Sequence, residues 1–410
     1  MLPTWPVATP PVIDLLSPVS FANGQPHEQF RWLRANDPVH WHEEEAGPGF
    51  WAVTRHEDVR RVGRDPVSFS SEPTIMIPDD SGIDMGGHRM MLMMDPPGHT
   101  GYRRLVIPDF LPRAVKELIP RIDALATAII DGVITRGECD LVEEVAGLMP
   151  SYVIAEMLGM PRSDGVDLYR LTETIHAAPE GQPPGAAIQA VASMFNYAHQ
   201  VWEEKRRQPA DDLASRLAHG EVDGRPLDEI DFNLFFLLLV DAGGDTTRNL
   251  VAAGALALLE HPTQLEALHS DLHGTLDSAV EELLRWVSPV IYMRRTATTD
   301  LTIGQTKVSA GDKVVMYYGS ANRGEAAFTD PDTLDVRRRP NDHVAFGGGG
   351  PHFCLGARIG RAEIRSVMSE MLTRLVDLEP AGPVEWLPSN FISGPKHFPV
   401  RFRPGAPVLS

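Results

Sequence analysis

The chain has 410 residues, 43% of them hydrophobic, which is enough to bury a substantial core. Its formal net charge of −19 would repel nucleic acid and anionic membrane surfaces, so neither is expected as a partner. Its two cysteines, Cys139 and Cys354, lie far apart and have no zinc-ligand spacing, which disfavours a zinc site or a disulfide framework and fits the reducing cytoplasm.

The first hundred residues predict a short helix, a small sheet and a long loop. Residues 26–34 have a helical pattern, and residues 39–41 and 50–54 read as strands. We find no signal peptide and no apolar run of membrane-spanning length, so membrane insertion is not expected. Residues 70–97 are rich in Gly, Pro, Asp and Met without lasting periodicity, which indicates a long loop of a kind that usually carries function.

Helices dominate the remaining chain. The middle of one of them, at residues 228–259, is apolar on nearly all sides, which is typical of a helix that crosses a core. Without an internal repeat or a convincing linker, the pattern predicts one mainly helical domain with small β-sheets over residues 1–410. The other predicted helices lie at 114–134, 141–158, 187–207, 265–287 and 355–375, and alternating stretches lie at 294–303 and 313–318.

The most informative segment is a glycine-rich loop, FGGGGPHFCLG, from Phe346 to Gly356. A cysteine just ahead of a helix lies in the positive field of the helix N-terminus, which favours the thiolate. Glycines let backbone N–H groups approach a sulfur or a flat ligand, and Phe346 would shield that sulfur from water. These features suit Cys354 as a thiolate ligand of haem iron. A phosphate loop would need a Lys-Ser/Thr pair, and a cysteine hydrolase would need a third orienting group.

The predicted core helix contains a second unusual segment, Ala242-Gly-Gly-Asp245-Thr246-Thr. Glycine inside a helix costs about 1 kcal/mol relative to alanine, so two adjacent glycines need a reason such as the close approach of a ligand. An acid beside a hydroxyl can pass protons into such a site. The alternative is a packing kink in which Thr246 bonds back to its own helix.

Both segments resemble the cytochrome P450 superfamily, whose cysteine loop reads F-x-x-G-x-H/R-x-C-x-G and whose core helix carries A/G-G-x-D/E-T. Phe346 stands one residue further from the cysteine here, as in some lipid-oxidising actinobacterial members. The resemblance implies the P450 fold, a triangular-prism helical domain enclosing haem b. It also implies that Cys354 binds the iron, that Ala242 and Gly356 lie against the haem, and that Asp245 and Thr246 form the catalytic proton relay.

The resemblance extends to groups that hold the haem propionates. The segment DPPGHTGYRR matches the family's D-P-P-x-H-T-x-x-R-R, and its His99 and Arg103 share one helix face. Arg295 and His352 match the other two propionate partners. Each would otherwise be an ordinary solvated cation.

A further match concerns structure rather than chemistry. Glu282 and Arg285 match the family's E-x-x-R. Their partner is Arg338, from the Pro/Arg/Asp-rich meander at residues 321–343, and the resemblance implies that this group braces the cysteine loop. Taken alone, a pair three residues apart on a helix means no more than an exposed ion pair worth a few tenths of a kcal/mol.

The family resemblance implies a monooxygenase that uses O2 and hydroxylates a C–H bond of an apolar small molecule, whether sterol, terpenoid, fatty-acyl or polyketide-like. No flavin or iron–sulfur segment is evident, so a separate ferredoxin and ferredoxin reductase are expected to supply electrons. The alternatives are a haem-thiolate binding or sensing protein without turnover, a cysteine hydrolase, and a P450 that rearranges peroxides. The intact Asp245–Thr246 pair disfavours the first and the last.

Two expectations concern the surroundings of the haem. Six of the chain's methionines lie between Met76 and Met94, where the family places a pocket wall, and methionine adapts to irregular apolar shapes. Residues 334–365 carry six basic and three acidic side chains, which predicts a docking face for an acidic ferredoxin. The residues expected to face substrate are Met85, Met90, Leu238, Val290, Ile291 and Ile392.

Overall fold

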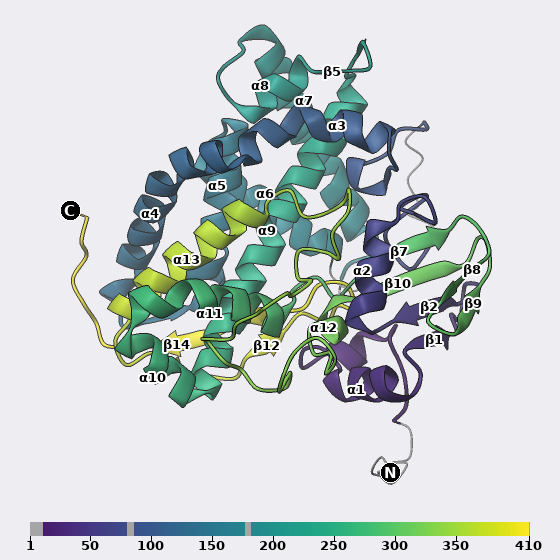
Figure 1. The fold of residues 1–410 in the computed structure, drawn as a ribbon. Helices are drawn as coiled ribbons and strands as arrows, with labels where there is room; N and C mark the ends of the chain where they lie inside the picture. The colour runs from purple at the N-terminus through teal and green to yellow at the C-terminus, as the bar shows by residue number, and fades with distance from the viewer. Residues whose placement is uncertain (1–10, 80–85, 177–181, 410) are drawn as a thin grey trace, which may run out of the picture.

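The computed structural model describes residues 11–79, 86–176 and 182–409, and it is mainly helical (Figure 1). A small five-stranded sheet lies on one side of the helical part, next to α1. The helices are α1 (His27–Asn36), α2 (His56–Arg64), α3 (Gly98–Val106), α4 (Pro112–Ile134), α5 (Leu148–Leu158), α6 (Arg162–His176), α7 (Ala186–Arg207), α8 (Leu213–Ala218), α9 (Glu229–Glu260), α10 (Pro262–Ser270), α11 (Leu272–Val287), α12 (Tyr318–Ala321) and α13 (Ala357–Arg374).

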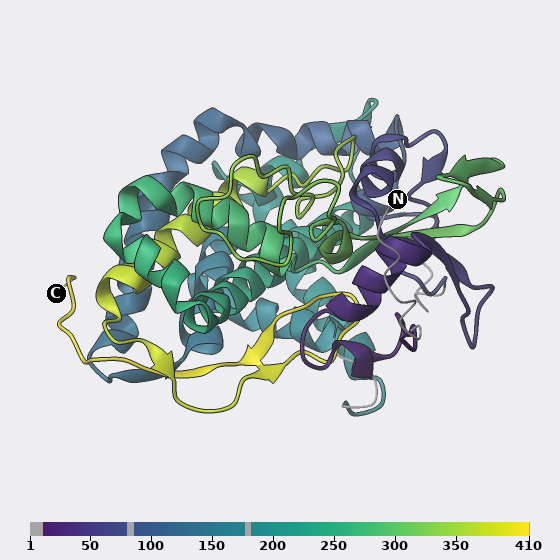
Figure 2. The same cartoon turned by 60° about the horizontal axis from the view of Figure 1, so that its bottom comes forward.

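The strands form one larger sheet and several small ones. The larger sheet has the order β1-β2-β10-β7-β3, in which β2 and β10 run parallel and the other neighbours antiparallel. Its strands are β1 (Val39–His42), β2 (Phe50–Val53), β10 (Lys313–Tyr317), β7 (Tyr292–Ala297) and β3 (Phe69–Ser70). The C-terminal strands run along the edge of the helical part (Figure 2). The smaller sheets are β11 (Glu379–Pro380), β14 (Pro399–Arg401) and β4 (Glu138–Asp140); β12 (Glu385–Trp386) and β13 (Pro395–His397); β5 (Glu221–Val222) and β6 (Arg225–Pro226); β8 (Leu301–Ile303) and β9 (Thr306–Val308).

Helix α9 runs through the centre of the helical part, and its sequence explains both its start and its burial. The Asp228 carboxylate accepts the N–H of Asp231 at 3.0 Å, and the Asp231 carboxylate in turn accepts the N–H of Asp228, which forms a capping box. Every residue from 234 to 240 is buried. This all-round burial follows from contacts with α5, α6, α7, α11 and α13.

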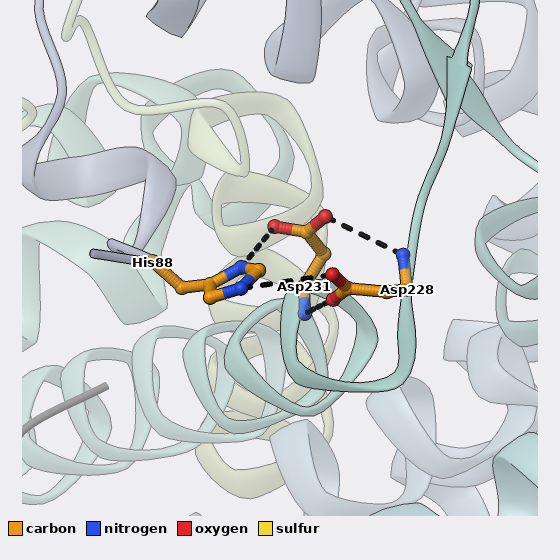
Figure 3. A group of neighbouring side chains, drawn as sticks. All are labelled: His88, Asp228 and Asp231. Atoms are coloured by element: carbon orange, nitrogen blue, oxygen red, sulfur yellow. Dashed lines mark hydrogen bonds and ion pairs between the residues drawn. The ribbon is translucent and has the colours of Figure 1, made fainter. Parts of the chain in front are cut away.

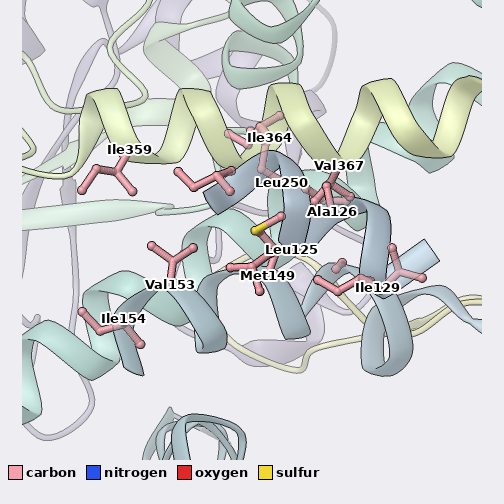
Figure 4. Close-up of a cluster of buried hydrophobic side chains, with 14 of the residues drawn as sticks. Leu125, Ala126, Ile129, Met149, Val153, Ile154, Leu250, Ile359, Ile364 and Val367 are labelled. Atoms are coloured by element: carbon pink, nitrogen blue, oxygen red, sulfur yellow. The ribbon is translucent and has the colours of Figure 1, made fainter. Parts of the chain in front are cut away.

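The main hydrophobic cluster fixes α13 against the central helix (Figure 4). Ile129 of α4, Met149 of α5, Leu250 of α9 and Val367 of α13 all belong to it. Burying one such side chain stabilises the fold by about 1.5–3 kcal/mol. Because the cysteine loop leads directly into α13, this packing also sets the position of the loop.

Two helices predicted as continuous are divided, each for a local reason. The helix predicted at 265–287 breaks into α10 and α11 because Asp271 leaves the helical conformation and accepts the N–H of Gly274 at 3.0 Å. The helix predicted at 141–158 begins as a π-helical turn, η4 (Val142–Ala146), before α5. None of the described helices combines the length and apolar character that crossing a membrane requires.

Candidate functional site

A cavity of about 260 Å³ lies between α9 and the cysteine loop. It brings together segments that are far apart in the sequence: the loop before α3, the middle of α9, strand β7 and the start of α13. The residues singled out from the sequence that line it are His99, Arg103, Leu238, Ala242, Thr246, Val290, Arg295, Phe346, His352, Cys354 and Gly356.

The glycine run of the cysteine loop is needed for its backbone path and for its packing on α2. Gly347, Gly349 and Gly350 all have positive φ, between 78° and 102°, which side chains strain to adopt. A Cβ at Gly348 would lie only 2.7 Å from the carbonyl oxygen of Val59 in α2. The loop is one residue longer than the family pattern, and its glycines allow the longer backbone to pack closely against α2.

Cys354 is accessible from the cavity, at the N-terminal end of α13. Its backbone N–H donates to the carbonyl of Phe346 at 3.0 Å. Burial raises the pKa of the Cys354 thiol, while hydrogen bonds from the backbone of Gly356 and Ala357 lower it. The helix terminus thus lowers the thiol pKa as predicted, but its effect is smaller than that of desolvation. A metal ion bound to the sulfur would supply the positive charge that stabilises the thiolate.

Phe346 lines the cavity despite its shifted position in the loop. The Arg361 guanidinium lies 4.5 Å from the centre of its ring. Arg361 is itself held by Glu281, with Nη2 and Oε2 separated by 2.8 Å. The ring therefore stays beside the cysteine and is fixed by a cation on α13.

Four cationic or potentially cationic side chains converge at one end of the cavity. The rings of His99 and His352 have centroids 4.2 Å apart. Arg295 is 4% exposed and donates to the carbonyl of Arg294, and Arg103 donates to the carbonyl of Phe353. None of the four forms an ion pair with a carboxylate in the part of the chain that the structure describes.

The electrostatics of this cluster show that it lacks a counter-charge. Burial and then Arg103 lower the pKa of His99 to about 4, and burial followed by Arg295 lowers the pKa of His352 to about 3. The buried Nδ1 of His99 has no hydrogen-bond partner among the described residues. The site therefore fits a cofactor that offers carboxylates to this cluster and a metal ion to Cys354.

Helix α9 presents Thr246 to the cavity and Asp245 to the other side. Thr246 Oγ1 donates to the carbonyl of Ala242 at a long 3.4 Å, so it bonds back to its helix and also faces the cavity. Asp245 is buried and lines a separate small cavity. A Cβ at Gly244 would lie 2.8 Å from the Tyr169 ring of α6, so this glycine serves helix packing.

The rest of the cavity wall is apolar. Leu238 and Val290 line it, together with residues that were not anticipated, including Val153, Met157 and Met293. Among the methionines of the long loop that the structure describes, Met91 lines the cavity, while Met90 packs on the main core. Ile291 and Ile392 belong instead to the cluster beneath the sheet, and Met85 lies outside the described residues.

The long loop is fastened to the start of α9 through His88 (Figure 3). Its two ring nitrogens face Asp231 at 3.1 Å and Asp228 at 3.6 Å. These three groups lie close enough to surround a metal ion. The Asp231 carboxylate, however, already accepts from Tyr102 at 2.9 Å and from Arg225 at 2.8 Å, and the arginine would repel a cation. The group therefore acts as an anchor for the pocket wall.

Glu282, Arg285 and Arg338 form a buried network under the meander. Arg285 donates to both carboxylate oxygens of Glu282 at 2.8 Å, and Arg338 Nε lies 3.1 Å from each of them. Arg285 also donates to the carbonyl of Asn322, whose side chain accepts the N–H of Val344 at 2.7 Å. The network thus continues to the segment that leads into the cysteine loop.

A buried acid beside the cavity was missed from the sequence. Glu363 of α13 lines the cavity and accepts a hydrogen bond from Thr247 Oγ1 at 3.0 Å. Burial raises the pKa of Glu363 to about 7. The only signal in the sequence was an acid between Ile359 and Ile364 on the apolar face of a helix.

Comparison with known proteins agrees with this site. The cytochrome P450 family model matches residues 185–385. A "methyl-branched lipid omega-hydroxylase" of Mycobacterium tuberculosis is 40% identical over 363 residues, covering 87% of this chain and 84% of that protein. A "steroid C26-monooxygenase" of Mycolicibacterium smegmatis is 37% identical over 408 residues, covering 98% and 99%. The structure of a Mycobacterium marinum cytochrome P450 in complex with pseudoionone gives a TM-score of 0.90 at 36% identity, covering 97% and 100%.

The fold and the relatives together define a haem-dependent oxygenase. The chain belongs to the cytochrome P450 family. Its fold is the P450 fold, its cofactor is haem b, and it is a monooxygenase, so the family and fold class predicted from the motifs are confirmed.

Proposed function

We propose that this P450 hydroxylates a C–H bond of a sterol-like or branched lipid in the cytoplasm, with Cys354 as the iron ligand. The observation that supports this most directly is the cavity, in which the cysteine thiol, the uncompensated cationic cluster and an apolar wall meet. The relatives named above as lipid and steroid oxygenases support an apolar substrate. A non-catalytic haem-binding protein would have no need for Thr246 at the cavity surface.

Each group at the cavity has a distinct task in this proposal. His99, Arg103, Arg295 and His352 hold the two propionates, and Cys354 Sγ holds the iron. When bound, haem supplies the centre at which O2 is activated and inserted into the C–H bond. Phe346, which lines the cavity beside Cys354, would help to keep water away from the thiolate once the haem is bound. Thr246 Oγ1 holds a water molecule that donates protons at the cavity surface. Asp245, on the far side of α9, supplies the protons that replace those donated.

The proposal is tested first by spectroscopy and then by binding. The purified holoprotein is expected to show the reduced, carbon monoxide-bound absorption of a thiolate-ligated haem. A library of sterols, terpenoids, methyl-branched fatty acids and small polar compounds is then scored for displacement of the iron-bound water. Hits confined to small polar compounds would contradict the assigned substrate class, and a colourless protein would contradict the haem assignment.

Thr246→Ala is expected to uncouple electron use from product formation. The variant should keep its carbon monoxide spectrum and still consume reduced nicotinamide through supplied partners, but more electrons should end in hydrogen peroxide. General acid–base groups contribute ~10²- to 10⁴-fold, which sets the upper scale of the loss in product per electron. Thr246→Ser, which keeps the hydroxyl, should restore most of the coupling. An unchanged yield in the alanine variant would assign Thr246 to helix packing alone.

We also propose that an acidic ferredoxin, reduced by its own reductase, docks on the side of the cysteine loop. The structure makes this basic face weaker than the sequence count indicated. Arg338 is bound in the meander network with its side chain only 9% exposed, and Arg361 and Arg365 pair with Glu281 and Asp277. Arg358, exposed in the first turn of α13, has no carboxylate partner among the described residues.

Arg358→Glu is therefore expected to slow electron transfer by roughly tenfold at low ionic strength, with little effect in high salt, because steering between exposed charges is screened. The measurement is the rate of haem reduction by an acidic ferredoxin under carbon monoxide. Arg207→Glu, at the exposed end of α7, changes the net charge equally and should leave the rate unaltered. Equal slowing in both variants would point to net charge rather than a docking site.

A further inference from the structure

A second, small cavity lies on the side of α9 that faces away from the haem cavity. It has a volume of about 20 Å³ and is lined by Glu173 of α6, by Asp245 and Arg248 of α9, and by the segment around Ser389. Four of its lining residues carry polar side chains, namely Glu173, Asp245, Arg248 and Ser389, and a space of this size holds about one water molecule. Asp245 therefore shares a water-sized chamber with a second carboxylate, while its neighbour Thr246 faces the haem cavity.

Glu173 reaches both this chamber and solvent. Its side chain is 23% exposed, whereas Asp245 is 6% exposed and the side chain of Arg248 is 1% exposed. Arg248 forms an ion pair with Glu173, lies 3.2 Å from Glu143 Oε1, and stacks over the Tyr169 ring at 5.0 Å. The buried arginine thus fixes Glu173 at the mouth of the chamber.

Backbone segments from two other parts of the chain pack against the Arg248 side chain. The π-helical turn η4 is followed by Gly147, where a Cβ would be in ordinary van der Waals contact with the Arg248 side chain, at 3.6 Å. π-Helical turns occur frequently at functional sites. A second segment, through the carbonyl of Lys396, also accepts from Arg248 at 3.4 Å.

From this geometry we infer that Glu173 is the carboxylate through which protons enter the relay of Asp245 and Thr246. The inference rests on the proposed role of that pair. The Glu173 carboxyl gives its proton to the water in the chamber, and this water gives a proton to the Asp245 carboxylate. Asp245 passes its proton on towards Thr246 and Glu173 regains one from solvent, so both carboxyl groups return to their starting state and each delivered proton comes from solvent.

The surroundings of Glu173 act in both directions, since its ion pair with Arg248 favours the ionised carboxylate while burial and two neighbouring acids favour the protonated form. Burial, followed by the carboxylates of Glu143 and Asp245, raises the pKa of Glu173 to about 7, while Lys396 and His397 act in the opposite direction. Glu173 is therefore protonated in part of the molecules near neutral pH, which suits a group that both accepts and donates protons. Burial lowers the pKa of Arg248 only to about 10, so the arginine stays charged and keeps its position.

The test uses the haem-loaded enzyme and compares Glu173→Gln with Glu143→Gln. Both glutamates pair with Arg248, but Glu143 does not line the chamber. In the wild type, product formation should fall as pH rises through about 7, because Glu173 loses its proton. Glu173→Gln should abolish this inflection, lower product formation by at least ~10-fold and increase the solvent deuterium isotope effect. Glu143→Gln should keep the inflection but move it to lower pH, because a like charge near Glu173 is removed.

A second readout does not depend on turnover. The infrared carbonyl band of protonated Glu173, identified by its loss in Glu173→Gln, should titrate near neutral pH in the resting protein. In Asp245→Asn it should titrate at lower pH, because the neighbouring negative charge is gone. An unmoved band, or a Glu173→Gln variant with the wild-type pH profile and isotope effect, would overturn the inference. A wild-type protein that binds haem but makes no product would instead overturn the proposed function, and the infrared titration would still decide whether the two carboxyls are coupled.

Discussion

Cys354→Ala is expected to abolish product formation and the thiolate-type carbon monoxide spectrum, while the chain still folds. The side chain lies at the surface of the cavity rather than in a packed core, so its removal leaves few lost contacts. Without Cys354 no other thiol lines the cavity, because the second cysteine, Cys139, is buried in β4. The effect should be the largest of any single substitution on activity.

Cys139→Ala is the matched control for this prediction. It removes the same group from a buried site, and burial raises the pKa of the Cys139 thiol to about 12, so that thiol stays protonated. The control should keep the thiolate spectrum and lose only a little stability. Circular dichroism of both variants shows whether each is folded. A thiolate spectrum that survives in Cys354→Ala and is lost in Cys139→Ala would contradict the assignment.

The sequence predicted those elements whose determinants are local. The start of α9 at Asp228 could be expected because its capping residues are neighbours in the chain. Helix α6 was missed because much of what holds it is tertiary. It packs on α5, α7 and α9, and a Cβ at Gly165 would collide with the carbonyl of Ser151. A glycine that weakens helical periodicity in the sequence is thus required by the packing of two helices.

In the candidate site, too, the contacts that depend on tertiary structure could not be predicted from the sequence. Motif spacing identified Asp245 and Thr246 but did not indicate that they face separate cavities on opposite sides of α9. Nor could it reveal that Asp245 shares the chamber with Glu173, because α6 and α9 are brought together only by folding. Ion pairs between distant segments could not be predicted from the sequence either. Arg361 was counted as an unpaired cation, but in the structure it forms an ion pair with Glu281.

The contribution of the E-x-x-R pair to stability depends on its surroundings. As a surface pair it would contribute a few tenths of a kcal/mol. In the structure Glu282 and Arg285 are both 0% exposed, and Glu282 also accepts from Arg338, from the N–H of Asp335 at 2.9 Å and from Asn341 at 3.1 Å. Removing the carboxylate would therefore leave a fully buried guanidinium without its counter-ion.

Glu282→Ala is accordingly expected to lower the free energy of unfolding by about 3–5 kcal/mol, the usual result of breaking a buried pair on one side. This is a large part of the ~5–15 kcal/mol that stabilises a typical protein. Because the network reaches Val344 through Asn322, the variant should also lose haem more readily. Urea denaturation and haem transfer to apomyoglobin measure the two effects. Glu117→Ala, which breaks the exposed Arg113–Glu117 pair of α4, should change stability by less than ~1 kcal/mol. If both variants changed stability equally little, the pair would not brace the cysteine loop, and that loop would have to be held by its contacts with α2 and by the packing of α13.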